Sequence, residues 1–190
     1  MSSFKQNLPN YLTIFRVILI PFLLISFYFE KGDIKTISAA IFLIASFSDF
    51  LDGYLSRKWH VESRFGAMLD PIADKLLVAT ALCLVITEEA WLVIPTVVII
   101  CREIFISGLR EFLGKSGDIE MPVSNLAKWK TASQMAATTL LLLTSGIIAN
   151  PTVTINILYY LGCIIFWLSA GLTLYTGYKY YIAAKQQDLI

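Results

Sequence analysis

Four aspartates form two pairs at helical spacing, at the facing ends of two apolar stretches. Asp49 and Asp52 stand three residues apart, and Asp70 and Asp74 stand four apart. Residues at these spacings share one face of a helix, so the sequence predicts two carboxylate-bearing faces that can meet at one point. Clustered carboxylates repel one another and are costly to desolvate, so a cation has to lie among them. Hard divalent ions such as Mg2+ or Mn2+ take oxygen ligands, and a pair of them can clamp a phosphate chain.

Glycines and an arginine accompany the aspartates on the same two faces. Gly53 and Arg57 continue the first face, and Gly66 begins the second. A glycine removes the side chain where a nucleotide could approach the backbone. Any one of the aspartates alone is more typical of a helix cap. The whole set at fixed spacing instead favours a reaction centre, because acids inside a membrane are functional by default.

Two further polar patterns flank the aspartates. Asn10, Thr13 and Arg16 recur at three-residue steps on an otherwise apolar helix, where Arg16 could equally well extend to a lipid phosphate. Downstream, basic residues stand at the ends of two apolar segments. These charges either set the membrane topology or form a basic pocket for a small anion. The basic residues concerned are Arg102, Arg110, Lys128 and Lys130.

The elements that must hold these groups lie in a membrane. The chain has 190 residues, of which 57% are hydrophobic and only 15% charged, and its mean hydropathy of +0.69 is too high for a soluble domain. A net charge of +1 gives no general attraction to nucleic acid. The single histidine and three scattered cysteines leave no zinc or haem site, so any metal must be held by oxygen.

We expect an all-α, polytopic membrane protein with six transmembrane helices and a short N-terminal interfacial segment, forming a single domain over residues 1–190. The first ten residues show no removable signal peptide. Each span needs about 20 largely apolar residues, fewer where protein surrounds it. The predicted spans are roughly Tyr11–Phe29, Thr36–Asp52, Pro71–Thr87, Trp91–Leu109, Thr131–Ala149 and Ile155–Tyr178.

The basic residues predict the orientation of these spans. If the chain crosses the membrane six times, 13 of its 15 Lys and Arg residues lie on one side of the membrane. Lys31 and Lys35 lie on the other side. The positive-inside rule places the side with the 13 basic residues in the cytoplasm. We therefore expect a multi-pass protein of the cell (cytoplasmic) membrane, with both termini and the aspartates on its cytoplasmic side.

The stretch from Asp49 to Asp74 resembles the signature of the CDP-alcohol phosphotransferase family, D-x2-D-G-x2-A-R-x8-G-x3-D-x3-D. It matches at every named position except Ser56, where the family usually has alanine. The opening N-x2-T-x2-R segment and two later segments resemble those of bacterial family members that make phosphatidylglycerol phosphate, in which the later ones read R-E-I…L-R-E and G-K-x-K-T-x2-Q. In the last segment Ala127 replaces a glycine. The resemblance covers the chain from Leu8 to about Gln134.

The resemblance implies a role for each of these residues. Two divalent metal ions, Mg2+ or Mn2+, would be held by Asp49, Asp52, Asp70 and Asp74, and Asp74 would also act as general base. The CDP-lipid would be bound by Asn10, Thr13, Arg16, Gly53, Arg57, Gly66 and Asp70. The phosphate of the acceptor would be bound by Arg102, Arg110, Lys128 and Lys130. Family members tend to be homodimers, which is the expectation here.

The expected activity is transfer of the phosphatidyl group from CDP-diacylglycerol to sn-glycerol 3-phosphate, giving phosphatidylglycerol phosphate and CMP. Inositol phosphate, inositol, serine or phosphatidylglycerol remain alternative acceptors, because the signature is common to the family. A cation transporter that uses intramembrane carboxylates is an alternative from another class, and a non-catalytic membrane scaffold ranks last. The last span, rich in aromatic residues, suggests packing and lipid-interface anchoring only.

Overall fold

The computed structural model describes residues 3–29, 35–59, 64–115, 125–145 and 153–186. Within these ranges the chain is entirely helical, which confirms the all-α prediction. A 3-10 turn, η1 (Ala90–Leu92), leads into the fourth helix. The α-helices are α1 (Ser3–Tyr28), α2 (Lys35–Trp59), α3 (Arg64–Glu88), α4 (Val93–Lys115), α5 (Asn125–Ser145) and α6 (Val153–Gln186).

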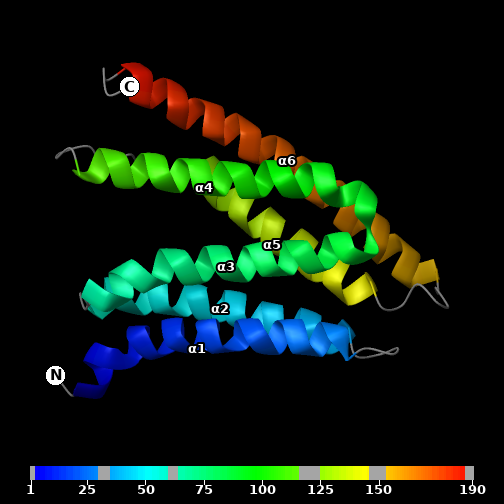
Figure 1. Ribbon diagram of the computed structural model, residues 1–190, viewed down its shortest axis with the longest axis horizontal. Coiled ribbons are helices and arrows are strands. Elements are labelled where there is room, and N and C mark those ends of the chain that lie inside the picture. Colours follow the sequence, from blue (N-terminus) through cyan, green and yellow to red (C-terminus); the bar gives the residue numbers. More distant parts are fainter. Residues whose placement is uncertain (1–2, 30–34, 60–63, 116–124, 146–152, 187–190) are drawn as a thin grey trace.

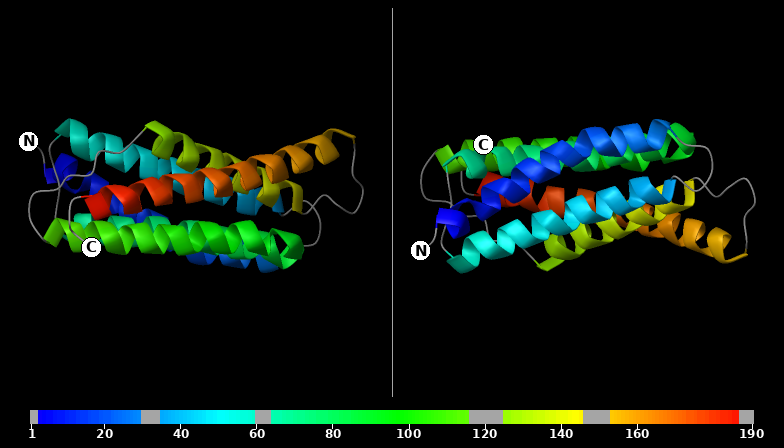
Figure 2. Two further views of the ribbon diagram at one scale, coloured as in Figure 1. Left: turned by 90° about the horizontal axis from the view of Figure 1, so that it is seen from above. Right: turned by 90° about the horizontal axis from the view of Figure 1, so that it is seen from below.

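The helices run up and down in one elongated bundle (Figures 1 and 2). Because successive helices alternate in direction, α1 begins and α6 ends at the same end, on the left in Figure 1. The first turns of α1, α3 and α5 and the last turns of α2, α4 and α6 make up this end, which we call the polar end. It brings together segments that are far apart in the sequence, including the parts of α2 and α3 that carry the aspartates.

Much of the outside of the bundle is apolar. Phe42, Leu77 and Phe166 are fully buried between the helices. On the outside, Phe47 exposes 60% of its surface and Leu168 exposes 62%. An exposed apolar surface of this size would be unfavourable in water, whereas lipid tails would cover it. The structure is therefore that of a membrane-embedded protein.

Four of the described helices contain a stretch long and apolar enough to cross a membrane. These stretches are Asn10–Tyr28, Thr36–Leu55, Ala90–Leu109 and Val153–Ile182. The two remaining predicted spans fall in α3 and α5, which the same criteria of length and composition do not select. A physical reason lies in their surroundings, since α5 packs against α2, α3 and α6, and its buried residues include Gln134 and Thr138. A helix that faces protein can carry more polar side chains than one that faces lipid.

Several helices extend beyond the predicted spans at the polar end. The second span was expected to end at Asp52, but α2 continues to Trp59, and α3 begins at Arg64 rather than at Pro71. Both pairs of aspartates therefore stand on continuous helix. α1 also starts earlier, at Ser3, so the expected interfacial segment continues directly into the first long helix.

A glycine on α6 lies close against α5. A Cβ atom at Gly162 would lie 3.2 Å from Leu140 Cβ and 3.4 Å from Leu141 Cγ. Small residues allow helices to approach closely where apolar burial alone provides no driving force, as in lipid. This contact holds α5, whose first turns carry Lys130, against the last helix.

Candidate active site

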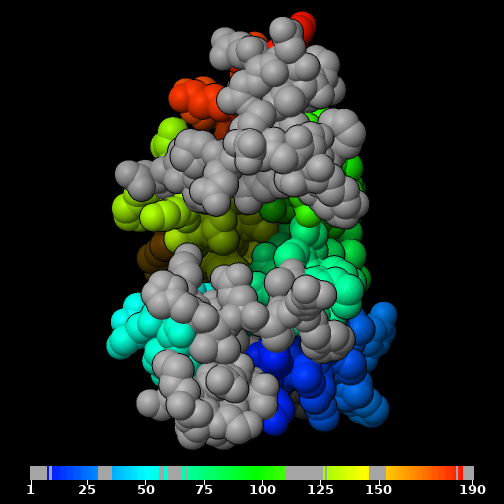
Figure 3. Space-filling model, turned by 90° about the vertical axis from the view of Figure 1, so that its left-hand side faces the viewer, coloured from blue at the N-terminus to red at the C-terminus, as the bar shows by residue number. Residues whose placement is uncertain are grey.

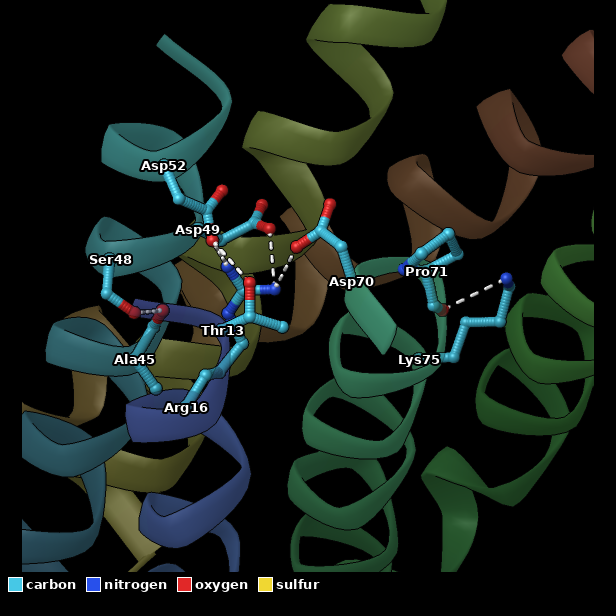
Figure 4. Close-up of polar contacts among 9 residues, drawn as sticks. All are labelled: Thr13, Arg16, Ala45, Ser48, Asp49, Asp52, Asp70, Pro71 and Lys75. Carbon is cyan, nitrogen blue, oxygen red and sulfur yellow. Dashed lines mark hydrogen bonds and ion pairs between the residues drawn. The ribbon is translucent and has the colours of Figure 1, made fainter. Parts of the chain in front are cut away.

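Three carboxylates from two helices converge at the polar end. Asp49 and Asp52 project from α2 and Asp70 projects from α3, and one oxygen of each lies within 4.8 Å of the others (Figure 4). Asp52 is buried, whereas Asp49 and Asp70 are partly exposed. The two faces that carry these aspartates therefore meet at one point.

The guanidinium of Arg16 lies at the centre of this cluster. Its Nη1 is 2.9 Å from Asp49 Oδ1 and 3.0 Å from Asp70 Oδ1, and its Nη2 is 2.5 Å from Asp52 Oδ2. Thr13, one turn earlier on α1, donates a hydrogen bond to Asp52 Oδ2 at 3.5 Å. Arg16 is fully buried, so these carboxylates supply the neutralisation that water would otherwise give. One positive charge against three negative ones leaves the cluster able to accept more cations.

Asp74 stands one helical turn beyond Asp70 and faces a cavity. Its Oδ1 is buried and has no hydrogen-bond partner within the described part of the chain, and the same holds for Gln134 Oε1. Leaving such an atom unpaired costs about 1–3 kcal/mol, so a ligand or ion is the natural partner. Both residues line a partly open cavity of about 210 Å³ between α3, α4 and α5. In the space-filling view of the polar end, the surface between α3 and α5 is recessed (Figure 3).

The charged residues on the other walls of the cavity are Glu103 from α4 and Lys130 from α5. Lys130 is buried and donates a short hydrogen bond to Glu103 Oε1. The same oxygen accepts a hydrogen bond from Arg102 Nη1 at 3.2 Å. Arg102 itself is directed toward α6, where its Nη2 donates to Thr176 at 3.1 Å. The predicted acceptor residues Lys130 and Arg102 are thus linked through Glu103.

The remaining candidate residues differ in burial and in whether the structure describes their side chains. Asn10 is half-buried on the same helix as Thr13 and Arg16, and Gly53 and Gly66 are half-buried on α2 and α3 near the aspartates. Lys128 is exposed on α5, whereas Lys130 two residues later is buried. The side chains of Arg57 and Arg110 lie outside the described residues.

Glu103 and Gln134 belong to the cavity, although neither was predicted as a site residue. An acid within the apolar stretch of α4 was the available signal for Glu103, because such a residue needs a specific reason to be there. Gln134 gave a weaker signal, since a polar amide one turn after Lys130 is also compatible with simple helix packing.

The donor atoms at the convergence point suit a hard divalent metal ion. Among the described residues they are the carboxylate oxygens of Asp49, Asp52 and Asp70, and the Oδ1 of Asp74, which has no described partner, lies one turn further along α3. Mg2+ and Mn2+ prefer such ligands to nitrogen or sulfur. The aspartate cluster can therefore hold a metal ion, in agreement with the need for a cation inferred from the sequence.

Comparison with known proteins agrees with this geometry. Residues 6–175 match the family model described as CDP-alcohol phosphatidyltransferase. A protein of Rickettsia felis is 42% identical over 95% of this chain and 97% of its own length. One of Salmonella choleraesuis is 43% identical, covering 94% of this chain and 95% of its own, and one of Haemophilus influenzae is 49% identical, covering 70% and 74%. All three are named CDP-diacylglycerol--glycerol-3-phosphate 3-phosphatidyltransferase. The resemblance found in the sequence is confirmed, and the chain belongs to the CDP-alcohol phosphatidyltransferase family.

Proposed function

We propose that the chain transfers the phosphatidyl group of CDP-diacylglycerol to sn-glycerol 3-phosphate, giving phosphatidylglycerol phosphate and CMP. The observation that carries the proposal is the convergence of Asp49, Asp52 and Asp70 beside a cavity that Asp74 and Lys130 both line. The family match and the name that the three relatives share support this donor and this acceptor.

Asp74 acts as the general base in this reaction. It takes the proton of the 1-hydroxyl of glycerol 3-phosphate, and the hydroxyl oxygen attacks the lipid-side phosphorus of the diphosphate. A new P–O bond to glycerol forms while the P–O bond to CMP breaks, and CMP leaves with the electron pair. Lys130 holds the phosphate of the acceptor in the same cavity, so that the hydroxyl is placed close to Asp74. Arg110 and Lys128 add positive charge along the acceptor's approach.

The aspartates would hold two divalent metal ions, Mg2+ or Mn2+, with Asp49, Asp52, Asp70 and Asp74 as ligands. Bound metal would neutralise the diphosphate and stabilise CMP as the leaving group. Arg16 already lies where the aspartates converge, which places a second kind of positive charge beside the diphosphate. The residues that bind the CDP-lipid are Asn10, Thr13, Arg16, Gly53, Arg57, Gly66 and Asp70.

The polar end faces the cytoplasm in this proposal. All six α-helices cross the cytoplasmic membrane of the cell, α3 and α5 among them, and both termini lie on the inner side. The distribution of Lys and Arg supports this orientation. The lipid substrate enters sideways from the inner leaflet, the acceptor arrives from the cytosol, and the protein functions as a homodimer.

A panel of acceptors tests the proposed function. Purified protein in detergent is given CDP-diacylglycerol, Mg2+ or Mn2+, and one alcohol at a time, and CMP release is measured. We expect release with glycerol 3-phosphate and loss of that release when EDTA removes the metal. Turnover only with inositol phosphate, inositol, serine or phosphatidylglycerol would assign the chain a different acceptor. No CMP release with any alcohol would refute the proposal.

A further inference from the structure

The last helix, α6, is connected to the acceptor side of the cavity through Arg102. Thr176 accepts a hydrogen bond from Arg102 Nη2 at 3.1 Å and donates its own to the carbonyl of Thr173, also at 3.1 Å. Arg102 Nη1 lies 3.2 Å from Glu103 Oε1, the oxygen that also pairs with Lys130. One continuous series of polar contacts therefore runs from α6 through α4 to the α5 wall of the cavity.

Gly177 lets Arg102 lie directly against α6. A Cβ atom at this position would lie 3.1 Å from Arg102 Cγ and 3.5 Å from its Nε. The first distance is tighter than nine in ten contacts that real Cβ atoms make, and Cγ belongs to the stem of the side chain, so the stem of Arg102 would have to shift by a few tenths of an ångström. The ring of Tyr180 lies over the guanidinium, with 5.9 Å between its centroid and the central carbon. α6 thus fixes both the stem and the charged group of Arg102.

Glu103 has two cationic partners, and an anionic acceptor needs one of them. An acceptor phosphate in the cavity must compete with Glu103 for the ammonium of Lys130. As long as Arg102 stays beside Glu103, that carboxylate keeps a cation after Lys130 turns to the phosphate. Without Arg102 in place, releasing Lys130 would leave a partly buried carboxylate unpaired, which is unfavourable. Glu103 would then retain Lys130, and the acceptor would bind weakly.

We propose that Thr176 and Gly177 are positioning residues for acceptor binding. They hold Arg102 against Glu103, so that Lys130 is available to the phosphate of the acceptor. In this arrangement Arg102 acts on the acceptor through Glu103. The inference rests on the proposed use of glycerol 3-phosphate and gives α6 a role that its aromatic-rich sequence did not suggest.

The test compares two variants with two matched controls on the same helix. Thr176→Val removes the hydroxyl that accepts from Arg102 but keeps the shape of the side chain, and Gly177→Ala adds the crowded Cβ. Thr173→Val is the control for the first, because the Thr173 hydroxyl is buried without a hydrogen-bond partner among the described residues. Gly171→Ala is the control for the second, because a Cβ there has no described neighbour within 4 Å.

Steady-state kinetics of the full chain in detergent, with CDP-diacylglycerol and Mg2+ or Mn2+, give the readout. We expect Thr176→Val and Gly177→Ala to raise the KM for glycerol 3-phosphate by about tenfold, the effect of losing one hydrogen bond to a charged group. The KM for CDP-diacylglycerol should stay within about twofold of that of the wild type, because the aspartate cluster is untouched. Thr173→Val and Gly171→Ala should leave both values unchanged, and Thr176→Ser, which keeps the hydroxyl, should restore the acceptor KM.

The outcomes separate this inference from the proposed function. A wild type that uses glycerol 3-phosphate, with an unchanged acceptor KM in both variants, overturns the inference alone. Equal increases in the KM of both substrates would also overturn it, since they would show general damage to the bundle. If Gly177→Ala fails to fold, Thr176→Val still decides, because valine has the same β-branched shape as threonine. A wild type that uses only acceptors without phosphate would overturn the proposed function and the inference together.

Discussion

Among the described residues, Arg16 is the cation that balances the charge of the aspartate cluster. Its guanidinium contacts Asp49, Asp52 and Asp70 and is fully buried. Removing one member of a buried ion-paired group is far more damaging than an average substitution, because the remaining charges stay buried without compensation. A divalent metal that binds the same carboxylates can compensate for the loss.

We therefore expect Arg16→Met to destabilise the protein by about 3–5 kcal/mol in metal-free buffer, and Mg2+ or Mn2+ to recover a large part of that loss. Thermal unfolding in detergent, with EDTA and then with excess metal, measures both quantities. Lys179→Met is the control, because Lys179 is exposed on α6 and contacts the Tyr175 ring at the surface. Equal melting temperatures for Arg16→Met with and without metal would show that the aspartates do not bind the ion.

Asp74 differs from the other three aspartates in having a buried oxygen without a described partner at the edge of the cavity. We expect Asp74→Asn to lower kcat by about 10²- to 10⁴-fold, the usual contribution of a general base, while CDP-diacylglycerol still binds. Asp70→Asn is the comparison, and it should mainly raise the metal concentration needed for half-maximal rate. The measurement is CMP release together with a direct binding assay for the CDP-lipid. A near-normal kcat in Asp74→Asn would remove this residue from proton transfer.

At the level of single residues, the sequence was informative where chemistry depends on spacing along one helix. The separation of Asp49 from Asp52 and of Asp70 from Asp74 placed each pair on one face without knowledge of the tertiary fold. The partners of Arg16 are 33 to 54 residues away, so only the packing of α1 against α2 and α3 could reveal them. The same is true of Glu103, whose partner Lys130 stands on another helix.

From the sequence, Lys128 and Lys130 were assigned the same role, but the first turns of α5 place them in different surroundings. Residues two apart on a helix point in nearly opposite directions, so Lys130 faces the cavity while Lys128 is exposed. We expect Lys130→Met to raise the KM for glycerol 3-phosphate by roughly tenfold to a hundredfold, because a charge-assisted hydrogen bond is lost. Lys128→Met should change that KM by less than about threefold. Steady-state kinetics over a range of acceptor concentrations will decide, and the opposite ranking would mean that the phosphate binds elsewhere on α5.

The contact between α5 and α6 provides a stability prediction at the level of whole helices. A larger side chain at Gly162 must push Leu140 and Leu141 aside, so Gly162→Val should destabilise the bundle by about 1–3 kcal/mol. Gly171→Val carries the same change in helix propensity at a position with free space, and it should cost much less. Thermal unfolding of both variants in the same detergent gives the comparison. Equal losses would show that propensity, not packing, explains the effect.

The sequence located the helices better than it located their ends. Apolar stretches marked all six α-helices, but α2 and α3 extend past the predicted spans into polar sequence. Hydropathy identifies the residues that can lie in lipid. A helix, however, continues as long as backbone hydrogen bonds and local contacts favour it. In α3, Lys75 donates a hydrogen bond to the carbonyl of Pro71, a contact that no average of hydropathy could foresee.

Across the whole molecule, most of the described charged residues lie toward one end of an apolar bundle, and Lys35, Glu88 and Glu89 lie at the other end. The aspartates stand in the last turns of α2 and the first turns of α3, and the cavity begins one turn further along α3 and reaches the first turns of α5. An ion path would instead need polar groups distributed along the length of the bundle, between the two membrane surfaces. This arrangement favours a reaction at one membrane surface over transport across it.

The same asymmetry predicts that the polar end faces the cytoplasm, and cysteine labelling in cells can test this orientation. After Cys83, Cys101 and Cys163 are replaced by alanine, a single cysteine is introduced either as Thr36→Cys at the start of α2 or as Lys185→Cys near the end of α6. Both positions are exposed, and they lie at opposite ends of the bundle. Because Lys and Arg are retained on the inner side, a membrane-impermeant maleimide should label Thr36→Cys in intact cells and Lys185→Cys only in inside-out vesicles. The reverse pattern would place the aspartates outside the cell, where a soluble phosphorylated acceptor from the cytosol could not reach them.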